Sequence, residues 1–551
     1  MSTGPAPAEV DLLDGAVGWP AELRERYVAE GYWREETLGG LLTAAVRRHG
    51  DATAIVAGDE RISYTNLDHR ADERARALRA LGIAPRDRVV VHLPNTAGFV
   101  VTLFALLRLG AVPVLTLPAH RHAEIAHLTA LSEAVAYVGP DVVEGFDYRR
   151  LGLDVAAEVG SLRHVLVDGD PIPGTVALAT LPAGSEDPLP RADPGQVAVL
   201  LVSGGTTGNP KLIPRTHRDY AYNARASAEV CGLTADDVYL SCLPLAHNFP
   251  LACPGLLGTL GVGGQVVLAP VPSPDITLPL VGAERVTVTA MVPPLLRLWV
   301  DVVGEHPGGT DLSSLRLVQV GGAKCDETLA RRVRPELGAA VQQVFGMAEG
   351  LLNYTRLDDP NDLVAVSQGR PLSPADEVRV VNEHGVDVPD GEPGELWTRG
   401  PYTLRGYYRA REIDPVAFTP DGFYRSGDVV RRLPGGYLVV EGRIKDVVNR
   451  GGENVAATVL EDHVLAHPDV AAAAVLGVPD PNLGEAVCVV LRPVPGVRPP
   501  SRRALRSFLS GRGLARFMYP DRVVVREDLP LTAVGKIDKR VLAAELRDGA
   551  R

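Results

Sequence analysis

The sequence predicts an α/β protein, in which a large layered N-terminal domain precedes a small α+β domain. Its 551 residues exceed the length at which one hydrophobic core usually stops growing, so two domains are expected. Through the first four-fifths of the chain, helical periodicity alternates with β-branched runs, which is typical of α/β layers. Near residue 442 this alternation gives way to a different pattern. We therefore expect domains at 1–441 and 442–551.

Two helix and strand pairs near the N-terminus carry the α/β prediction. A helix over 67–81 precedes a valine-rich strand over 88–91, and a helix over 99–109 precedes a strand over 112–115. Valine-rich runs favour extended backbone, and their alternation with helices suggests α/β layers.

The second domain is predicted from the strand-like run 439–443, which ends at a glycine and a lysine-aspartate pair. Beyond it, the sequence predicts a helix over 458–466, strands over 471–478 and 486–491, and an amphipathic helix over 501–514. The residues 498–526 hold eight arginines and the single acid Asp521. This local excess of positive charge could receive an acidic partner, or it could be an ordinary solvated helix face.

Composition restricts the possible partners. A formal charge of −12 and a pI near 5.6 argue against binding of nucleic acid or anionic lipid, so a small molecule is expected instead. The five cysteines are scattered, without metal-ligand spacing, and no signal peptide precedes the first domain, which indicates a reduced cytoplasm. Residues 239–274 lack charged side chains, but prolines and five glycines within 255–264 favour a buried core segment over a membrane span.

A glycine-rich loop follows the buried strand 199–202 and ends in a cation. Backbone N–H groups in such a loop can surround phosphate oxygens, while hydroxyls add donors and lysine adds charge. It lacks the Gly-Lys-Ser/Thr ending of a Walker loop, and a flexible surface turn is the alternative. The expected nucleotide ligands are Ser203, Gly204, Gly205, Thr206, Thr207, Gly208 and Lys211.

This loop resembles the phosphate loop of the adenylate-forming superfamily, which includes acyl-CoA synthetases, luciferases and nonribosomal peptide adenylation domains. Other segments match that family's motifs in order, although alone Glu349 and Asp428 could be solvated carboxylates and Arg443 an ordinary ion-pair partner. The resemblance implies that Glu349 helps hold Mg²⁺, that Asp428 accepts hydrogen bonds from the ribose and that Arg443 approaches the nucleotide. The remaining expected nucleotide contacts are Gly321, Gly322, Ala323, Val344, Phe345 and Gly346.

The same resemblance implies the fold and the catalytic groups. The small C-terminal domain should be mobile and turn about a hinge at Lys445. Its Lys536 should reach the α-phosphate of ATP and the substrate carboxylate, and His247 should position that carboxylate. Two departures stand out: Ala348 occupies a position where threonine is usual, and Asn454 one where a basic residue is common, so no role is carried over to Asn454.

Within the superfamily, the chain resembles the stand-alone aryl-acid adenylating enzymes of the 2,3-dihydroxybenzoate–AMP ligase type. The matching stretches are 19–20, 31–33, 211–217, 244–250, 357–360 and 399–408. Asn248 stands where amino-acid-activating relatives place an aspartate, and an amide suits an ortho hydroxyl. The positions that correspond to the acid pocket are Asn248, Phe249, Cys253, Ala290, Gln319, Gly321, Val344, Leu352, Asn353 and Lys536.

Two pocket positions favour a ring with one hydroxyl. Dihydroxybenzoate enzymes typically have serine in place of Cys253 and valine in place of Leu352, so the pattern resembles salicylate-activating members. Cys253 could instead be a small core residue. The expected reaction is adenylation of an aromatic acid with ATP and Mg²⁺, then transfer to a separate aryl carrier protein or to CoA. The alternatives are a 2,3-dihydroxybenzoate–AMP ligase, an aryl-CoA ligase, and a binding protein on an inactive fold.

Overall fold

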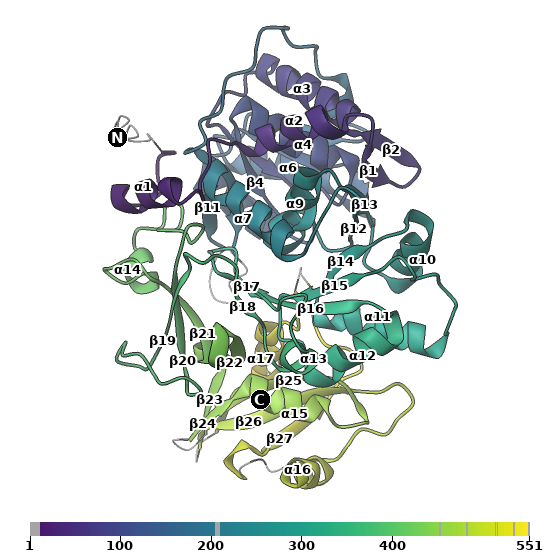
Figure 1. Cartoon of the computed structure of the whole chain (residues 1–551), viewed down its shortest axis with the longest axis vertical. Helices are drawn as coiled ribbons and strands as arrows, with labels where there is room; N and C mark the ends of the chain where they lie inside the picture. The colour runs from purple at the N-terminus through teal and green to yellow at the C-terminus, as the bar shows by residue number, and fades with distance from the viewer. Residues whose placement is uncertain are drawn as a thin grey trace.

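The computed structural model describes residues 12–203, 210–450, 453–480, 483–512, 514, 516–532 and 535–548. Sheets of nine, seven, four and five strands form its framework, and the last of these lies at the lower end of the molecule in Figure 1. The predicted α/β class is confirmed, as is the large layered N-terminal part with a small C-terminal one. The large domain and the small domain are the parts of the chain before and after the boundary expected between residues 441 and 442.

The seven-stranded sheet is built around a buried parallel core. Its central strands consist of valine and leucine with few polar residues, which suits strands covered on both faces. Helices α4 (Ala97–Leu109) and α6 (Tyr148–Glu158) pack against these strands. In order across the sheet, its strands are β11 (Leu212–Thr216), β10 (Val197–Val202), β4 (Val112–Leu115), β3 (Arg88–Val91), β5 (Ala136–Pro140), β8 (His164–Asp168) and β9 (Val176–Ala177).

The nine-stranded sheet positions most of the predicted acid pocket. In order, its strands are β18 (Arg370–Pro371), β17 (Leu352–Tyr354), β16 (Ala340–Gly346), β15 (Leu317–Gly321), β14 (Val288–Met291), β12 (Val238–Ser241), β13 (Gln265–Leu268), β1 (Thr53–Ala57) and β2 (Glu60–Ser63). Helix α9 (Gly255–Val262) packs on one face, and α11 (Pro293–Glu305), α12 (Glu327–Leu337) and α13 (Asn361–Val366) contact the strands β15 and β16. Strand β1 joins this sheet although β3, which follows it in the chain, belongs to the other one.

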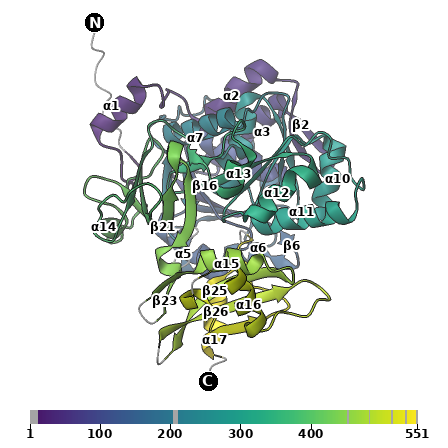
Figure 2. The same cartoon turned by 60° about the horizontal axis from the view of Figure 1, so that its bottom comes forward.

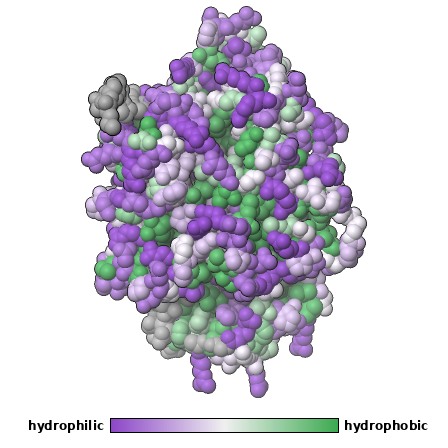
Figure 3. All heavy atoms as spheres, in the orientation of Figure 1, coloured by the Kyte–Doolittle hydropathy of each residue, from purple (hydrophilic) through white to green (hydrophobic). Residues whose placement is uncertain are grey.

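The uncharged segment 239–274 is core, as predicted. It contains most of β12, the short helices α8 (Asn248–Ala252) and α9, and β13, and most of its residues are buried. Among the residues that the structure describes, no helix is both long and apolar enough to cross a membrane. On the face shown in Figure 3, hydrophobic residues alternate with hydrophilic ones over the surface.

An antiparallel sheet connects the two domains. Its strands are β19 (Glu377–Val381), β20 (Pro393–Arg399), β21 (Tyr424–Arg432) and β22 (Leu438–Arg443). The expected boundary falls inside β22, which runs directly into a single turn at Ile444–Asp446. The backbone of the proposed hinge residue Lys445 lies in this turn.

The small domain forms a sheet with helices on both faces (Figure 2). Its main elements agree with the sequence prediction to within a few residues: α15 (Ala457–Leu465), β25 (Val470–Asp480), β26 (Gly484–Pro493) and α16 (Arg502–Gly511). The others are β23 (Val447–Arg450), β24 (Glu453–Ala456), β27 (Arg522–Val525) and α17 (Lys539–Asp548). One apolar cluster packs α15 and α16 against the sheet, and a second packs α17 on the other face.

Candidate active site

The base of the glycine-rich loop is closed by reciprocal hydrogen bonds. The Ser203 N–H donates to the carbonyl of Lys211 at 2.9 Å, and the Lys211 N–H donates to Oγ of Ser203 at 3.0 Å. The predicted ligands Gly204, Gly205, Thr206, Thr207 and Gly208 lie outside the described residues. The Lys211 ammonium lies 4.7 Å from the centre of the Tyr407 ring, a cation–π contact that directs it toward the interior.

Glu349 is tied to a pair of tyrosines. The Tyr407 hydroxyl donates to its Oε1 at 2.9 Å, and the Tyr407 and Tyr424 hydroxyls lie 2.9 Å apart. Burial raises the pKa of the Glu349 carboxyl, whereas the Tyr407 hydrogen bond and Arg443 oppose that shift. Lys211 and Glu349 thus contact the same tyrosine from the glycine-rich loop and from the segment after β16.

Asp428 and Arg443 form an ion pair between neighbouring strands. Nε of Arg443 lies 2.8 Å from Oδ1 of Asp428, and β21 and β22 place the two residues directly opposite each other. Burial raises the pKa of the Asp428 carboxyl, and Arg443 and Lys536 act against it. Asp428 raises the pKa of Arg443 in turn. The carboxylate and the guanidinium predicted for the nucleotide are therefore adjacent.

Lys536 reaches this group from the small domain. A Cβ placed on Gly322 would lie 3.4 Å from Cε of Lys536, so the aliphatic part of the lysine passes directly over that glycine. Burial lowers the pKa of Lys536 to about 8, with a further lowering by Arg443, while Asp428 and Glu349 raise it. Ala323 is exposed beside Gly322. The small domain is thus closed onto the large one, with the lysine inside the site.

His247 lies next to Lys536 and caps α8. Its Nδ1 accepts a hydrogen bond from the Phe249 N–H at 3.3 Å, so the ring proton belongs on Nε2. Burial, together with the positive charge of Lys536, lowers the pKa of His247 to about 4. The imidazole is therefore neutral near pH 7 and presents one N–H donor.

Part of the predicted acid pocket is assembled on one face of the nine-stranded sheet. A Cβ on Gly321 would lie 3.1 Å from the Phe249 ring and 2.7 Å from the Val344 carbonyl, so only glycine fits between them. Strand register places Ala290 beside Gln319 and Val344 beside Gly321. Apart from Gln319, these residues are small or apolar, which suits one flat face of an aromatic ring.

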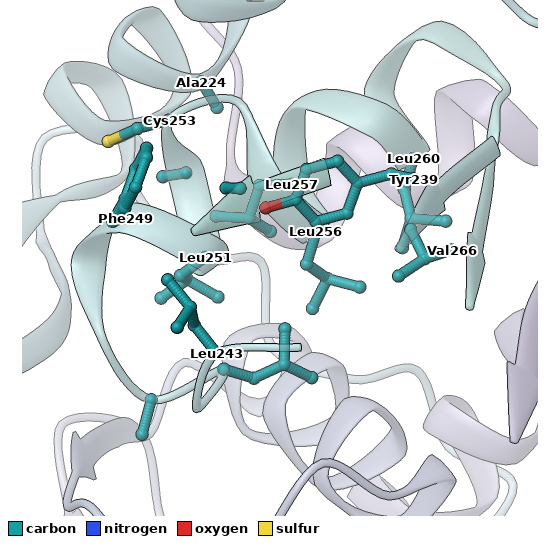
Figure 4. Packing of buried hydrophobic residues seen from close by; sticks show 14 of the residues in the cluster. Ala224, Tyr239, Leu243, Phe249, Leu251, Cys253, Leu256, Leu257, Leu260 and Val266 are labelled. Carbon is teal, nitrogen blue, oxygen red and sulfur yellow. The ribbon is translucent and has the colours of Figure 1, made fainter. Parts of the chain in front are cut away.

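Asn248 is a predicted pocket residue whose side-chain amide already forms two hydrogen bonds with the protein. The Tyr220 hydroxyl donates to Oδ1 at 2.8 Å, and Nδ2 donates to Sγ of Cys253 at 3.5 Å. Figure 4 shows Cys253 beside Phe249, with the hydroxyl of Tyr239 directed to the same side. Burial raises the pKa of Cys253 to about 12, so it stays a thiol. One N–H of Nδ2 is left for a ligand, and this donor suits an ortho oxygen.

Two predicted pocket residues have side chains that already form hydrogen bonds with other protein groups. Asn353 pairs with Phe345 across β16 and β17, and its Nδ2 donates to the Phe345 carbonyl at 3.0 Å. Alternation along β17 puts Asn353 on the face opposite Leu352, which pairs with Gly346, and the placement of Asn353 in the pocket stays a prediction. Gln319 lies on the pocket face, but its Nε2 donates to Cys231 and Gln342, and its buried Oε1 has no partner in the described part of the chain.

Sequence reasoning missed the tyrosines that hold the site. Tyr407 belongs to a stretch matched in the sequence, yet nothing in the sequence distinguishes it from a core aromatic. Tyr220 precedes Asn248 by more than two turns of helix and a strand. Tyr220 lies on α7 (His217–Val230), which is buried on nearly all sides, so periodicity along this helix does not distinguish it either.

A protein-only metal site is absent from the residues that the structure describes, since no group of three or more His, Cys, Asp or Glu could hold an ion. The Glu349 carboxylate nevertheless fits Mg²⁺, because that ion is commonly bound by one or two carboxylates together with substrate phosphates. Its Oε1 is already fixed in direction by Tyr407.

Comparison with known proteins gives consistent matches over the chain. Residues 42–408 match the AMP-binding enzyme family, and residues 459–536 match the AMP-binding enzyme C-terminal domain. A salicyl-AMP ligase / salicyl-S-ArCP synthetase of Mycobacterium tuberculosis is 51% identical over 98% of this chain and 96% of its own. A 2,3-dihydroxybenzoate-AMP ligase of Bacillus subtilis is 50% identical over 96% of this chain and 97% of its own.

A solved structure agrees with the fold. The apo structure of MbtA from Mycobacterium smegmatis superposes with a TM-score of 0.75 at 50% sequence identity, and covers 97% of this chain and 99% of its own. The nearly equal identities to a salicylate enzyme and to a dihydroxybenzoate enzyme leave the ring to be decided by individual pocket residues.

Proposed function

This chain belongs to the AMP-binding enzyme family as a stand-alone aryl-acid adenylating enzyme, and from that premise we propose that it converts an aromatic acid to its acyl-adenylate with ATP and then passes the acyl group to the thiol of a separate aryl carrier protein. The observation that carries the proposal is the position of Lys536. Its side chain lies over Gly322 of the large domain, and its charge acts on His247, Glu349, Asp428 and Arg443, although it comes from the other domain.

The first step joins the acid to the nucleotide. A carboxylate oxygen attacks the α-phosphorus, an O–P bond forms, and pyrophosphate leaves with the electron pair of the broken P–O bond. An aromatic acid is already ionised near pH 7, so no general base is required. Catalysis then depends on positioning and on stabilising the negative charge of the transferring group.

Each of the clustered residues has a distinct task in this step. The Lys536 ammonium stabilises charge on the α-phosphate and the attacking carboxylate. Neutral His247 donates its Nε2–H to that carboxylate and orients it, without removing a proton. Asp428 accepts from the ribose hydroxyls through the oxygen that Arg443 leaves free. Glu349 is the residue that would hold Mg²⁺, and a bound ion there would supply positive charge to offset that of the phosphates.

The ring we propose is salicylate or a substituted salicylate. The remaining N–H of Asn248 serves the ortho hydroxyl, as it would for both candidate acids. A second hydroxyl at the 3-position would meet the weakly polar Cys253 thiol and the bulk of Leu352. A hydroxyl buried there without a good partner costs roughly 1 to 3 kcal/mol.

Pyrophosphate exchange with ATP tests the reaction and the ring together. The panel consists of benzoate, salicylate, 2,3-dihydroxybenzoate and an α-amino acid, each as the only carboxylate. We expect exchange with the ortho-hydroxy acids, fastest with salicylate, and none with the amino acid. If no acid of the panel supports exchange, the result would favour a binding protein on an inactive fold. Faster exchange with 2,3-dihydroxybenzoate than with salicylate would reverse the ring assignment.

The acceptor is tested separately. Radiolabelled salicylate and ATP are incubated with the enzyme and either a phosphopantetheine-bearing aryl carrier protein or free CoA at equal concentration. Faster labelling of the carrier supports the proposal, and preference for CoA would identify an aryl-CoA ligase.

A further inference from the structure

An ion pair joins the two domains beside the site. The ammonium nitrogen of Lys324 lies 2.9 Å from Oδ2 of Asp462, and their side chains are only 16% and 27% exposed. Lys324 follows β15 in the large domain, and Asp462 lies on α15 in the small domain. The motifs of the sequence assign no role to either residue.

The loop that carries Lys324 also forms the surface under Lys536. Gly322, two residues before Lys324, lies directly beneath the Lys536 side chain. On the small domain, a Cβ on Gly535 would lie 3.4 Å from Cγ2 of Val292, which also contacts Gly322. A rotation of the small domain that withdraws Lys536 therefore has to separate Lys324 from Asp462.

Charges around Asp462 make the ion pair matter for closure. Burial raises the pKa of the Asp462 carboxyl and the charge of Asp326 adds to this, while Lys324 and His463 oppose it. Asp326 is held in place by Arg297 at 2.5 Å. Without Lys324, the closed arrangement would bury the Asp462 charge next to a second carboxylate, which is unfavourable at low dielectric.

We propose that Lys324 and Asp462 are positioning residues for adenylation, whose ion pair holds the small domain in the arrangement that places Lys536 at the reacting groups and must break before thiol transfer. The inference rests on the proposed function and adds to it a device that sets the balance between the two half-reactions. The pair does not touch substrate, so its effect is on the fraction of enzyme that is closed.

The experiment measures both half-reactions for Lys324→Gln, Asp462→Asn and the double variant. Pyrophosphate exchange should fall on the order of tenfold in kcat for each single variant, as expected for a modest coupling free energy. Transfer of preformed salicyl-adenylate to pantetheine in a single turnover should be unchanged or faster. The double variant should be no worse than either single one, because both remove the same interaction. Lys324→Arg, which keeps the charge, should retain most of the exchange rate.

Arg149→Gln is a matched control. Arg149 and Asp147 form an ion pair of the same length, 2.9 Å, with side chains 16% and 25% exposed, wholly inside the large domain. The Arg149→Gln variant should leave the rates of both half-reactions unchanged. Equal loss in the two half-reactions, additive losses in the double variant, or wild-type exchange in both single variants would each overturn the inference. If the wild type exchanges no aryl acid, the proposed function and this inference fail together.

Discussion

The hydroxyl of Tyr220 donates a hydrogen bond of 2.8 Å to Oδ1 of Asn248, and both side chains are buried. Tyr220 lies on α7, and Asn248 begins α8. Because Oδ1 already accepts from Tyr220, the remaining N–H of Nδ2 is the group that the amide most readily offers to a ligand. We therefore expect the pocket to favour an acid with an oxygen that accepts at the ortho position, as a hydroxyl can and an ammonium group cannot.

Tyr220→Phe should reduce the preference for salicylate over benzoate by on the order of tenfold, because Oδ1 loses its donor and the amide is no longer held in one orientation. Benzoate, which lacks the ortho oxygen, is the internal control, and its kcat/KM should change little. Pyrophosphate exchange with both acids gives the ratio. An unchanged ratio would mean that Asn248 is oriented by other contacts.

Lys536→Ala should lower adenylation by roughly 10² to 10³, by analogy with other groups that stabilise charge in a transition state. Transfer of preformed acyl-adenylate should be much less affected, since the lysine contacts the nucleotide only while the small domain is closed as seen here. Measuring the two half-reactions separately decides the matter. Equal losses would show that Lys536 acts through overall stability.

The depressed pKa of Lys536 gives adenylation a high-pH limit. Only the protonated lysine stabilises phosphate charge, and its pKa in the free protein is about 8. Raising the pH through that value removes the proton, so kcat/KM for pyrophosphate exchange should fall by roughly tenfold for each pH unit above it. Lys536→Ala, measured over the same range, should lack this limb. A flat wild-type profile up to pH 10 would contradict the assignment.

Cys253→Ser should narrow the gap between salicylate and 2,3-dihydroxybenzoate. The thiol accepts weakly from Asn248 and Asn223 at 3.5 Å and 3.8 Å, and a hydroxyl at that position would be a better partner for a second ring hydroxyl. The improvement for the dihydroxy acid should be roughly 10 to 200-fold at most. Salicylate should be nearly unaffected. If the ratio of kcat/KM for salicylate to that for 2,3-dihydroxybenzoate is the same in both proteins, Cys253 does not determine which acid is preferred.

The arginine-rich surface gives a test of carrier binding. Arg502 and Arg506 are partly used inside the small domain, since they donate to the backbone carbonyls of Asp521 and Pro520 at 2.8 Å. Arg498 and Arg503 are exposed, and in the described residues neither guanidinium forms a hydrogen bond or ion pair. Reversing their charge avoids disturbing that loop.

Arg498→Glu with Arg503→Glu should slow acyl transfer to an acidic carrier protein several-fold at low salt and leave pyrophosphate exchange intact. The effect should shrink as ionic strength rises, because exposed charges are screened. Arg47→Glu, on the exposed face of α2 (Leu38–His49) in the large domain, is the control. Unchanged transfer at low salt would leave this surface as an ordinary solvated helix face.

The sequence was most informative where local periodicity and motif spacing coincide. The helix at 99–109 and the strand at 112–115 differ from α4 and β4 by at most two residues, because both are largely apolar and Gly110 ends the helix before the strand begins. The joint position of Glu349, Asp428, Arg443 and Lys536 could be expected from motif order alone. The tyrosines 407 and 424, which hold Glu349 in place, could not be expected from the sequence, because they look like ordinary core residues.

Contacts between distant segments could not be predicted from the sequence, because they depend on strand register and on how the two domains meet. Whether Asn353 enters the pocket depends on the register of β17 against β16, and one residue of register exchanges the two faces of a strand. The Lys324–Asp462 contact depends on how two separate domains meet, and neither charge differs in its local sequence from many solvated ones.

The membership of β1 in the nine-stranded sheet bears on how the chain is assembled during synthesis. Val56 pairs with Val267, so the strand made among the first sixty residues finds its neighbour only after the entire seven-stranded sheet has been translated. Until then, β1 and β2 form a hairpin whose open edge is available to other chains. Such long-range pairing slows folding and prolongs exposure to aggregation. N-terminal fragments that stop before residue 268 should therefore accumulate as insoluble material. Two complementary fragments expressed together should give soluble protein only if the chain is cut after β13.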